Sequence, residues 1–317
     1  MRRRLRWLPL LAALLAGPAA AAWPDRPVRL VVPFAPGGTT DIIARYYADF
    51  LRGRLPQPVL VENRPGAATN IGTELVARAE PDGTTLLLGA GLLVANPVWG
   101  PKPASDPFTA FAPISLITET QFLIAAGPRF APRSPQALVA LALREPGRHS
   151  ISSAQLDITV ARLTRGMGIE LEHVGYRGGA PAMTDAIAGQ VDMVVALVPV
   201  LLPAIQQGQL VPIGVSGSQR SPVLPNVPNL AESGFPAAVE MSWNAVLAPA
   251  STPEAIIRRL AAESRAFTED PEVVAKLRAR GIEPRASSSV ELAVLLRREY
   301  QDHQELLRLL GPLGSER

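Results

Sequence analysis

The clearest local pattern in the chain is VRLVVPFAPGGTTD, residues 28–41. Its first five residues form a short, mostly apolar run, which predicts a buried strand that the following prolines end. Gly37 and Gly38 let the backbone turn sharply and let another molecule approach closely. Apolar residues then recur at helical spacing up to about Gly53. The stretch therefore predicts a strand, a glycine turn and the start of a helix.

The start of this helix is suited to a bound anion. Thr39 or Thr40 can cap the helix, and Asp41 lies in its first turn. Free backbone N–H groups and the positive end of the helix dipole meet there, which favours a negative group. We expect the turn to hold a carboxylate in a cleft, with an ordinary ligand-free turn as the alternative. Asp41 could bond a ligand or only complement the helix dipole.

A second unit of the same kind follows. Residues 59–61 predict a strand, 63–68 a second glycine turn, 70–78 a helix and 84–88 a third strand. This alternation is typical of a mostly parallel α/β sheet, on which ligands gather at the carboxyl ends of the strands. Both glycine turns follow such ends. If the two strands are neighbours, both turns face one crevice.

The length and the later pattern favour two lobes. The chain has 317 residues, 47% of them hydrophobic, which is near the upper limit for one core. Residues 95–113 are proline-rich and predict an irregular surface excursion. The alternation then repeats, and a strand at 242–248 returns to the first lobe. We expect lobe 1 at residues 23–124 and 243–317 and lobe 2 at residues 125–242, joined by two crossings that form a hinge.

Two short strands, at residues 114–116 and 122–126, are expected on the way into lobe 2. A third glycine turn lies at residues 176–181. Within it, Arg177 could pair with a distal carboxylate or could be a surface charge. Asp192 lies inside an apolar strand, where an unpaired charge is costly. We expect its carboxylate to accept hydrogen bonds from loop N–H groups, with ligand contact as the alternative.

The N-terminus predicts export. Residues 1–6 form a basic segment with four arginines. The apolar run 7–15 is too short to cross a membrane, and residues 19–22 supply small side chains for cleavage before Trp23. We expect a cleaved signal peptide at residues 1–22, with a retained membrane anchor as the alternative. Its removal takes four arginines, so Lys and Arg fall from 31 to 27 against 28 Asp and Glu, a net charge of −1. Nucleic-acid binding thereby loses its main support.

The common catalytic patterns are missing. The chain has no cysteine, which excludes disulfides and thiolate chemistry, and it has no P-loop, H-E-x-x-H or G-x-S-x-G motif. His149, His173 and His303 have no partner at metal-ligand or triad spacing, so we expect structural roles for them.

Together, the segments resemble the extracytoplasmic receptors of tripartite tricarboxylate transporters, the Bug or TctC-like solute-binding proteins. They run in order across nearly all of the chain after the signal peptide, and jointly they are highly specific. The matching segments are WPDRPV (23–28), VPFAPGGTTD (32–41), VENRPGA (61–67), AEPDGTTL (79–86), YRGGAPA (176–182), GQVD (189–192), LPNVP (224–228) and WNAVLAP (243–249).

The resemblance implies an α/β fold of the periplasmic binding protein type II class, with a ligand cleft between two lobes and without enzymatic activity, cofactor or metal. It also implies a ligand whose carboxylate is held by backbone groups and ordered water in the first two glycine turns. The lobe 1 residues to which it points are Phe34, Gly37, Gly38, Thr39, Asp41, Gly66, Ala67 and Ala68. The lobe 2 residues expected at the ligand are Ser153, Asp157, Tyr176, Gly179, Ala180 and Ala196.

The chain departs from the family's pattern at two places. Thr69 replaces a glycine that is usual there, which would narrow the second turn. In the loop at residues 152–159, Gln155 and Asp157 stand where relatives have glycines. An acid facing the cleft would repel a second carboxylate and attract an amine. We therefore hypothesise that Asp157 biases the site away from tricarboxylates, towards monocarboxylates, amino acids or amidated acids.

The leading function is a monomeric periplasmic receptor that captures a small organic acid and delivers it to the membrane subunits of a transporter. The alternative from another class is a ligand sensor whose closed lobes contact a sensor kinase. A small-acid enzyme and a protein that has lost its ligand are further alternatives.

Overall fold

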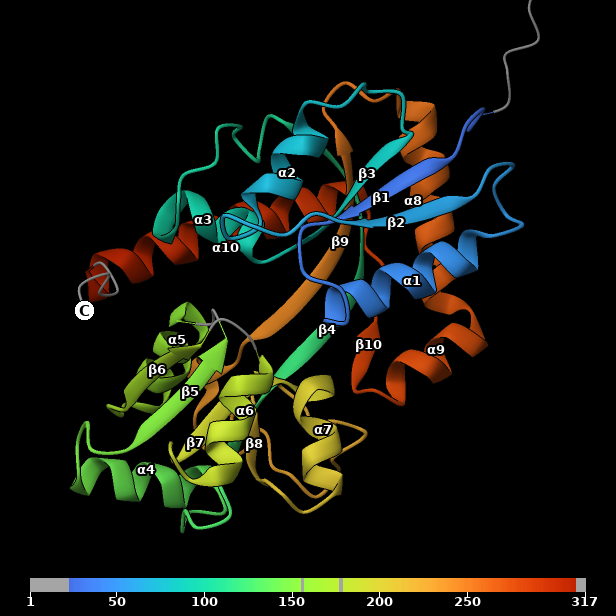
Figure 1. Ribbon diagram of the computed structural model, residues 1–317. Helices are drawn as coiled ribbons and strands as arrows, with labels where there is room; N and C mark the ends of the chain where they lie inside the picture. The colour runs from blue at the N-terminus through green and yellow to red at the C-terminus, as the bar shows by residue number, and fades with distance from the viewer. Residues whose placement is uncertain (1–22, 155–156, 177–178, 312–317) are drawn as a thin grey trace, which may run out of the picture.

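Strand β1 (Val28–Val32) is the middle strand of the first group of elements. It pairs in parallel with β2 (Val59–Asn63) on one side and with β3 (Thr85–Ala90) on the other. Helices α1 (Thr39–Leu51) and α2 (Asn70–Ala77) connect these strands (Figure 1). The strand, turn and helix expected from residues 28–41 are therefore confirmed. The first two strands are also neighbours in the sheet, as expected.

The computed structural model describes residues 23–154, 157–176 and 179–311. Its strands form one mixed sheet in the order β2-β1-β3-β9-β4-β7-β5-β6, and β10 and β8 also pair with β4. The remaining elements are α3 (Leu92–Trp99), β4 (Phe111–Ala126), α4 (Pro135–Arg144), β5 (Ser150–Ala154), α5 (Asp157–Met167), β6 (Glu172–Tyr176), α6 (Gly179–Ala188), β7 (Met193–Leu197), α7 (Val198–Gln206), β8 (Val211–Val215), a 3₁₀ turn (Pro236–Ala238), β9 (Met241–Pro249), α8 (Glu254–Glu269), α9 (Pro271–Arg278), β10 (Ile282–Pro284) and α10 (Ser289–Leu310).

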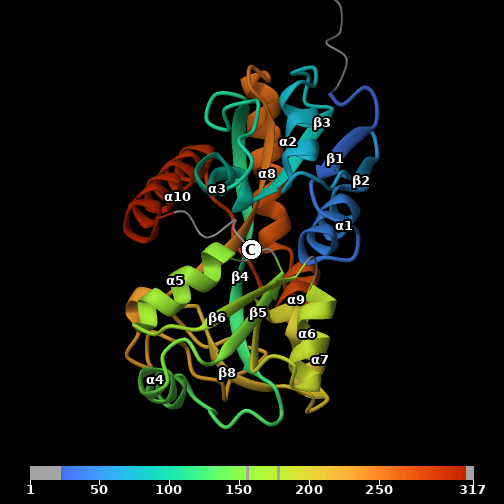
Figure 2. The same ribbon diagram turned by 60° about the vertical axis from the view of Figure 1, so that its left-hand side comes forward.

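Two antiparallel strands carry the chain between the lobes. β4 pairs with β9 from Phe111 to Gln121, and then with β7 from Phe122 and with β8 from Leu123. The elements on the β9 side of this change form lobe 1, and those on the β7 side form lobe 2 (Figures 1 and 2). The boundaries proposed from the sequence remain a proposal. The expectation of two short strands is wrong, because β4 continues unbroken through both lobes as one strand of 16 residues.

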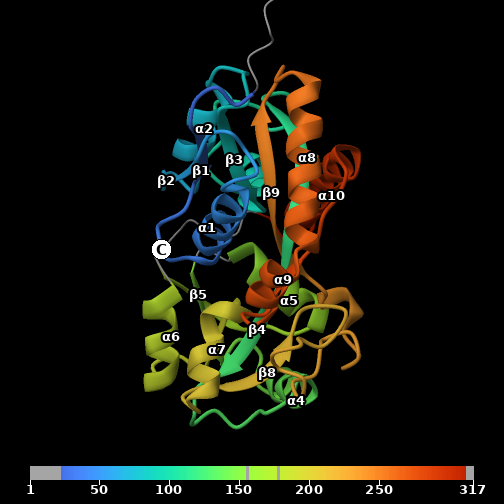
Figure 3. The same cartoon turned by 90° about the vertical axis from the view of Figure 1, so that its right-hand side faces the viewer.

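Apolar side chains pack against both faces of the sheet in each lobe. In lobe 1, one cluster lies under α1, α8 and α9, and another lies under α2, α3 and α10 (Figure 3). Tyr47 is fully buried in the first cluster, where its ring lies 5.1 Å from that of Phe267 and its hydroxyl lies 2.8 Å from Ser264 Oγ. In lobe 2, α4 and α5 cover one face and α6 and α7 cover the other.

Helix α3 corrects a further expectation. The proline-rich stretch from residue 95 was expected to be irregular, but its first residues belong to this helix, with Pro97 inside it. Leu93, Val94 and Ala95 are buried there. Packing of this apolar face against the lobe 1 core outweighs the cost of a proline within a short helix.

The carboxyl ends of β1 and β5 lie on the sides of the lobes that face each other. In Figure 1 the loop after β1 descends towards lobe 2 before α1 begins, and the arrow of β5 points up towards lobe 1. Figure 2 shows the same relation from another side. The residues that follow these strand ends are therefore the candidates for a site between the lobes.

Candidate functional site

The first glycine turn is held by Asp41. This residue is 2% exposed, and its carboxylate accepts hydrogen bonds from the Gly37 backbone N–H at 2.9 Å, from Asn63 Nδ2 at 2.9 Å and from Arg45 Nε at 3.0 Å. Burial raises the pKa of Asp41, but these hydrogen bonds outweigh it and hold the pKa below its usual value. The carboxylate is therefore ionised and shapes the turn.

Gly38, and not a threonine, is the N-cap of α1. Its ψ of 169° is extended, and no side chain caps this helix end. The expectation that Thr39 or Thr40 caps the helix is wrong, because both lie inside its first turn, buried. Thr40 instead accepts a hydrogen bond at 3.1 Å from Asn244 Nδ2 of β9. The first turn is thus tied to a strand that connects the lobes.

The second glycine turn has an unusual backbone. Gly66, Ala67, Ala68 and Thr69 all have positive φ, of 125°, 47°, 49° and 81°. Residues with side chains rarely adopt this conformation, and a β-branched residue does so least readily. Asn96, which is 4% exposed on α3, fixes the turn by donating a hydrogen bond to the Ala68 carbonyl at 2.5 Å.

The two turns lie side by side because their strands are paired. Val32 and Asn63, the last residues of β1 and β2, are partners in the parallel ladder. Asn63 Nδ2 donates to the Phe34 carbonyl at 3.1 Å as well as to Asp41. A Cβ atom on Gly72 would lie 2.7 Å from the Arg64 carbonyl, so glycine lets α2 pack closely beside both turns. The sequence analysis did not single out Asn63 or Asn96. The available signal was an amide at the end of a strand for Asn63 and an amide next to a proline for Asn96.

Unpaired backbone donors gather in both turns. The N–H groups of residues 38–41 are the first donors of α1 and have no acceptor within the described part of the chain. The N–H groups of residues 66–69 likewise lack one there. The nearby arginines already have acidic partners: Arg45 pairs with Asp41, and Arg64 shares Glu62 with Arg29. These turns can therefore offer an anion neutral main-chain donors.

Lobe 2 contains a chain of polar contacts at the carboxyl end of β5. Ser153 Oγ lies 2.7 Å from His173 Nε2, and His173 Nδ1 lies 3.3 Å from Asp157 Oδ1. Spacing along the sequence did not indicate these partners of His173. Its partners are far away in the sequence and meet it only because β5 and β6 are paired in parallel.

The other residues expected at the ligand in lobe 2 are placed as follows. Tyr176 ends β6 and donates its hydroxyl hydrogen to Asp185 of α6. Gly179 and Ala180 open α6, and Ala180 is exposed. Ala196 is buried in an apolar cluster on β7. Predictions that concern residues 155, 156, 177 and 178 lie outside the described residues.

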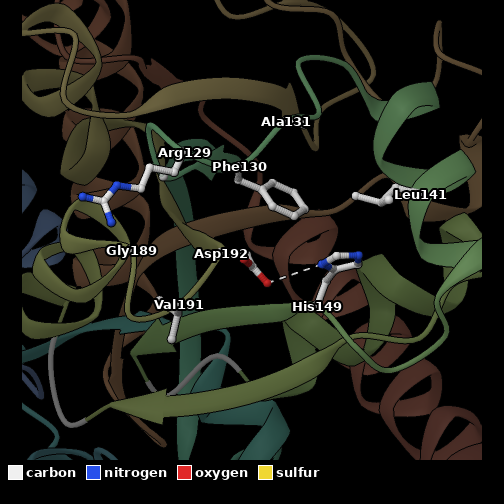
Figure 4. Close-up of a pocket in the computed structure, with 9 residues that line it drawn as sticks. Arg129, Phe130, Ala131, Leu141, His149, Gly189, Val191 and Asp192 are labelled. Atoms are coloured by element: carbon white, nitrogen blue, oxygen red, sulfur yellow. Dashed lines mark ion pairs between the residues drawn. The ribbon is translucent and has the colours of Figure 1, made fainter.

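A separate cavity of about 230 Å³ lies at the opposite edge of lobe 2, at the amino ends of β5 and β7. Figure 4 shows His149 facing Asp192 there, with Nδ1 at 3.5 Å from Oδ2, beside the ring of Phe130. Asp192 accepts a hydrogen bond from the Ser150 backbone N–H at 2.9 Å. The expected hydrogen bond from a main-chain N–H to Asp192 is therefore present, but it comes from the first residue of β5, and Asp192 lies just before β7 and not inside it.

Neither a metal cluster nor a membrane span is found in what the structure describes. Within residues 23–154, 157–176 and 179–311, no group of three or more His, Cys, Asp or Glu side chains is placed to hold a metal ion. Over the same residues, every helix is too short or too polar to cross a bilayer.

The fold and these turns define a protein of the periplasmic binding protein class. The model of the tripartite tricarboxylate transporter family receptors, TctC, matches residues 43–311, and the chain belongs to this family of solute-binding receptors. It is 32% identical to the protein BugT of Bordetella pertussis over 281 residues, which are 86% of each chain.

Two solved structures are similar over almost the whole chain. An R. palustris protein solved with adipate has a TM-score of 0.82 and 30% identity, covering 90% of this chain and 97% of that one. MatC from Rhodopseudomonas palustris, with bound malate, has a TM-score of 0.79 and 29% identity, covering 90% of this chain and 100% of the other. The family resemblance seen in the sequence is confirmed.

Proposed function

We propose that the protein is a periplasmic receptor that captures a small carboxylate-containing organic acid between its lobes and delivers it to a tripartite tricarboxylate-type membrane transporter. The observation that carries this proposal is the pair of turns at residues 34–41 and 66–69. They follow paired strands, and their backbone donors have no acceptor within the described residues. Such donors at a helix N-terminus attract an anion.

The neutrality of these donors suits a receptor that must release its ligand. The arginines beside the turns already pair with Asp41 and Glu62. A ligand carboxylate would therefore accept hydrogen bonds from main-chain N–H groups. These bonds are shorter and stronger than neutral hydrogen bonds because the acceptor is charged. No buried ion pair has to be broken when the ligand leaves.

The relatives support the same class of ligand. The two solved neighbours hold adipate and malate, both of which carry carboxylates. The family consists of transporter receptors, and the basic and apolar N-terminus of this chain suits export to the periplasm. Two lobes on paired strands suit hinge closure around a ligand.

Thr39 offers the sharpest test, because it is the first residue of α1 and follows an extended Gly38. Proline is well tolerated at this position and lacks the N–H group. We expect Thr39→Pro to weaken binding of the best carboxylate by about tenfold or more in calorimetry, the value of one charge-assisted hydrogen bond. Thr39→Ala keeps the N–H group and is the matched control. Equal affinities of the two variants would contradict the proposal, as would binding of no carboxylate.

A further inference from the structure

The contacts among Ser153, His173 and Asp157 have the order of a catalytic triad, but they cannot act as one. Ser153 is 0% exposed on β5, so no substrate can reach its hydroxyl oxygen. Ser153 and His173 instead position Asp157, whose side chain is 57% exposed. Their arrangement fixes this carboxylate where β5 ends and α5 begins.

The contact with His173 keeps the Asp157 carboxylate ionised and holds it in place. The hydrogen bond from His173 lowers the pKa of Asp157 more than burial raises it, so the carboxylate is ionised. His173 Nδ1 faces the Asp157 carboxylate and Nε2 faces the Ser153 hydroxyl, so the ring links the two side chains.

Asp157 lies on the side of lobe 2 that faces the two glycine turns of lobe 1. The carboxyl end of β5 lies on the side of lobe 2 that faces lobe 1 (Figures 1 and 2). On lobe 1, the donors of the turns favour a carboxylate. A ligand that bridges the lobes would thus meet N–H donors at one end and a carboxylate at the other.

We propose that Asp157, positioned by His173 and Ser153, binds an ammonium group of the ligand, so that the receptor takes an acid with an amine at its far end in preference to a dicarboxylate of the same length. This inference rests on the proposed function of the same site. The ligand class follows from the charge: a fixed carboxylate on lobe 2 attracts a cationic group of the ligand and repels a second carboxylate.

The test uses ligand pairs of equal length that differ only at the far end. Adipate is compared with 6-aminohexanoate, and succinate with 4-aminobutyrate, by calorimetry on the protein without its first 22 residues. We expect the amino acid of at least one pair to bind more tightly. In Asp157→Asn, the ratio of the two affinities should fall by about tenfold or more. Ser153→Ala should lower the ratio by less, because His173 still contacts Asp157.

Glu172→Gln is the matched control, because it removes one exposed acid from β6, next to His173 in the chain, and should leave the ratio unchanged. Thr39→Pro should weaken both members of a pair alike. A thermal unfolding midpoint for each variant checks that it folds. The inference is overturned if the dicarboxylates bind more tightly, if no amino acid binds, or if Asp157→Asn leaves the ratio unchanged. The proposed function fails separately, when no carboxylate of any kind binds.

Discussion

At the scale of single residues, the two glycine turns were predictable because their signal is local. Gly37 and Gly38 between an apolar run and a helical pattern define a turn wherever the rest of the chain lies. The partners of Asp157 were not predictable from spacing. His173 reaches Ser153 only through the parallel register of β5 and β6, which no local pattern in the sequence reveals.

Thr69 bears backbone strain that a glycine would relieve. Its φ of 81° costs a β-branched residue about 1–3 kcal/mol. We expect Thr69→Gly to raise the free energy of unfolding by up to about 1 kcal/mol, after the larger entropy that glycine gives to the unfolded chain is subtracted. Urea unfolding measures the change.

Thr73→Gly is the control for this prediction, because Thr73 is equally buried but lies in α2 with ordinary helical geometry. Glycine in a helix costs about 1 kcal/mol, so this variant should be less stable. If both variants lose the same stability, the strain at Thr69 is not significant.

At the scale of elements, contacts with α3 explain why the second turn keeps its shape. The sequence predicted the turn but not the helix beside it, because Pro97 and the prolines after it obscured the short apolar face. Asn96 joins the two elements: its Nδ2 lies within hydrogen-bonding distance of the Ala68 carbonyl and of Asn70 Oδ1. The shape of the second turn thus depends on α3, which comes later in the chain, after α2 and β3.

Replacing the donor of Asn96 by an acceptor tests this dependence. We expect Asn96→Asp to lower the free energy of unfolding by about 1–3 kcal/mol, because its carboxylate would face the Ala68 carbonyl in a buried site. Carboxylate affinity measured by calorimetry should fall as well. Asn226→Asp makes the same chemical change in an exposed loop and should alter neither quantity. Unchanged stability in Asn96→Asp would refute this role.

At the scale of the whole molecule, a buried acidic group lies where the chain returns to lobe 1. Glu240 directly precedes β9, and its Oε1 accepts from Thr159 of α5 at 3.2 Å. Arg162 of α5 lies 3.9 Å from Glu240 and 3.8 Å from Asp302 of α10, so it bridges the lobes. Burial raises the pKa of Glu240 to about 7, although Arg162 and Thr159 lower it.

This pKa predicts how stability changes with pH. Between about 4.5 and about 7 the folded protein holds a proton on Glu240 that the unfolded chain releases, so this group's contribution to stability falls as pH rises. We expect the stability of Glu240→Gln relative to the natural protein to increase from pH 5 to pH 8, by up to about 3 kcal/mol. Urea unfolding at several pH values measures it.

The contribution of His303 to stability changes with pH in the opposite direction to that of Glu240. For this reason Glu240→Gln is compared with the natural protein at each pH. Burial lowers the pKa of His303 to about 4, so the contribution of this histidine to stability is lost as pH falls from about 6.5 towards 4. This effect is common to both proteins and cancels in their difference. A difference that stays constant from pH 5 to pH 8 would contradict the assignment for Glu240.

The paired strands β4 and β9 have a mechanical consequence. Because the two connections share a ladder of hydrogen bonds, neither strand can swing alone, and any change in the angle between the lobes must bend both together. Asn244 lies on β9 and donates to Thr40 in the first turn. Flexing of this double-stranded ribbon would therefore reach the backbone of the first glycine turn through the Asn244 side-chain amide.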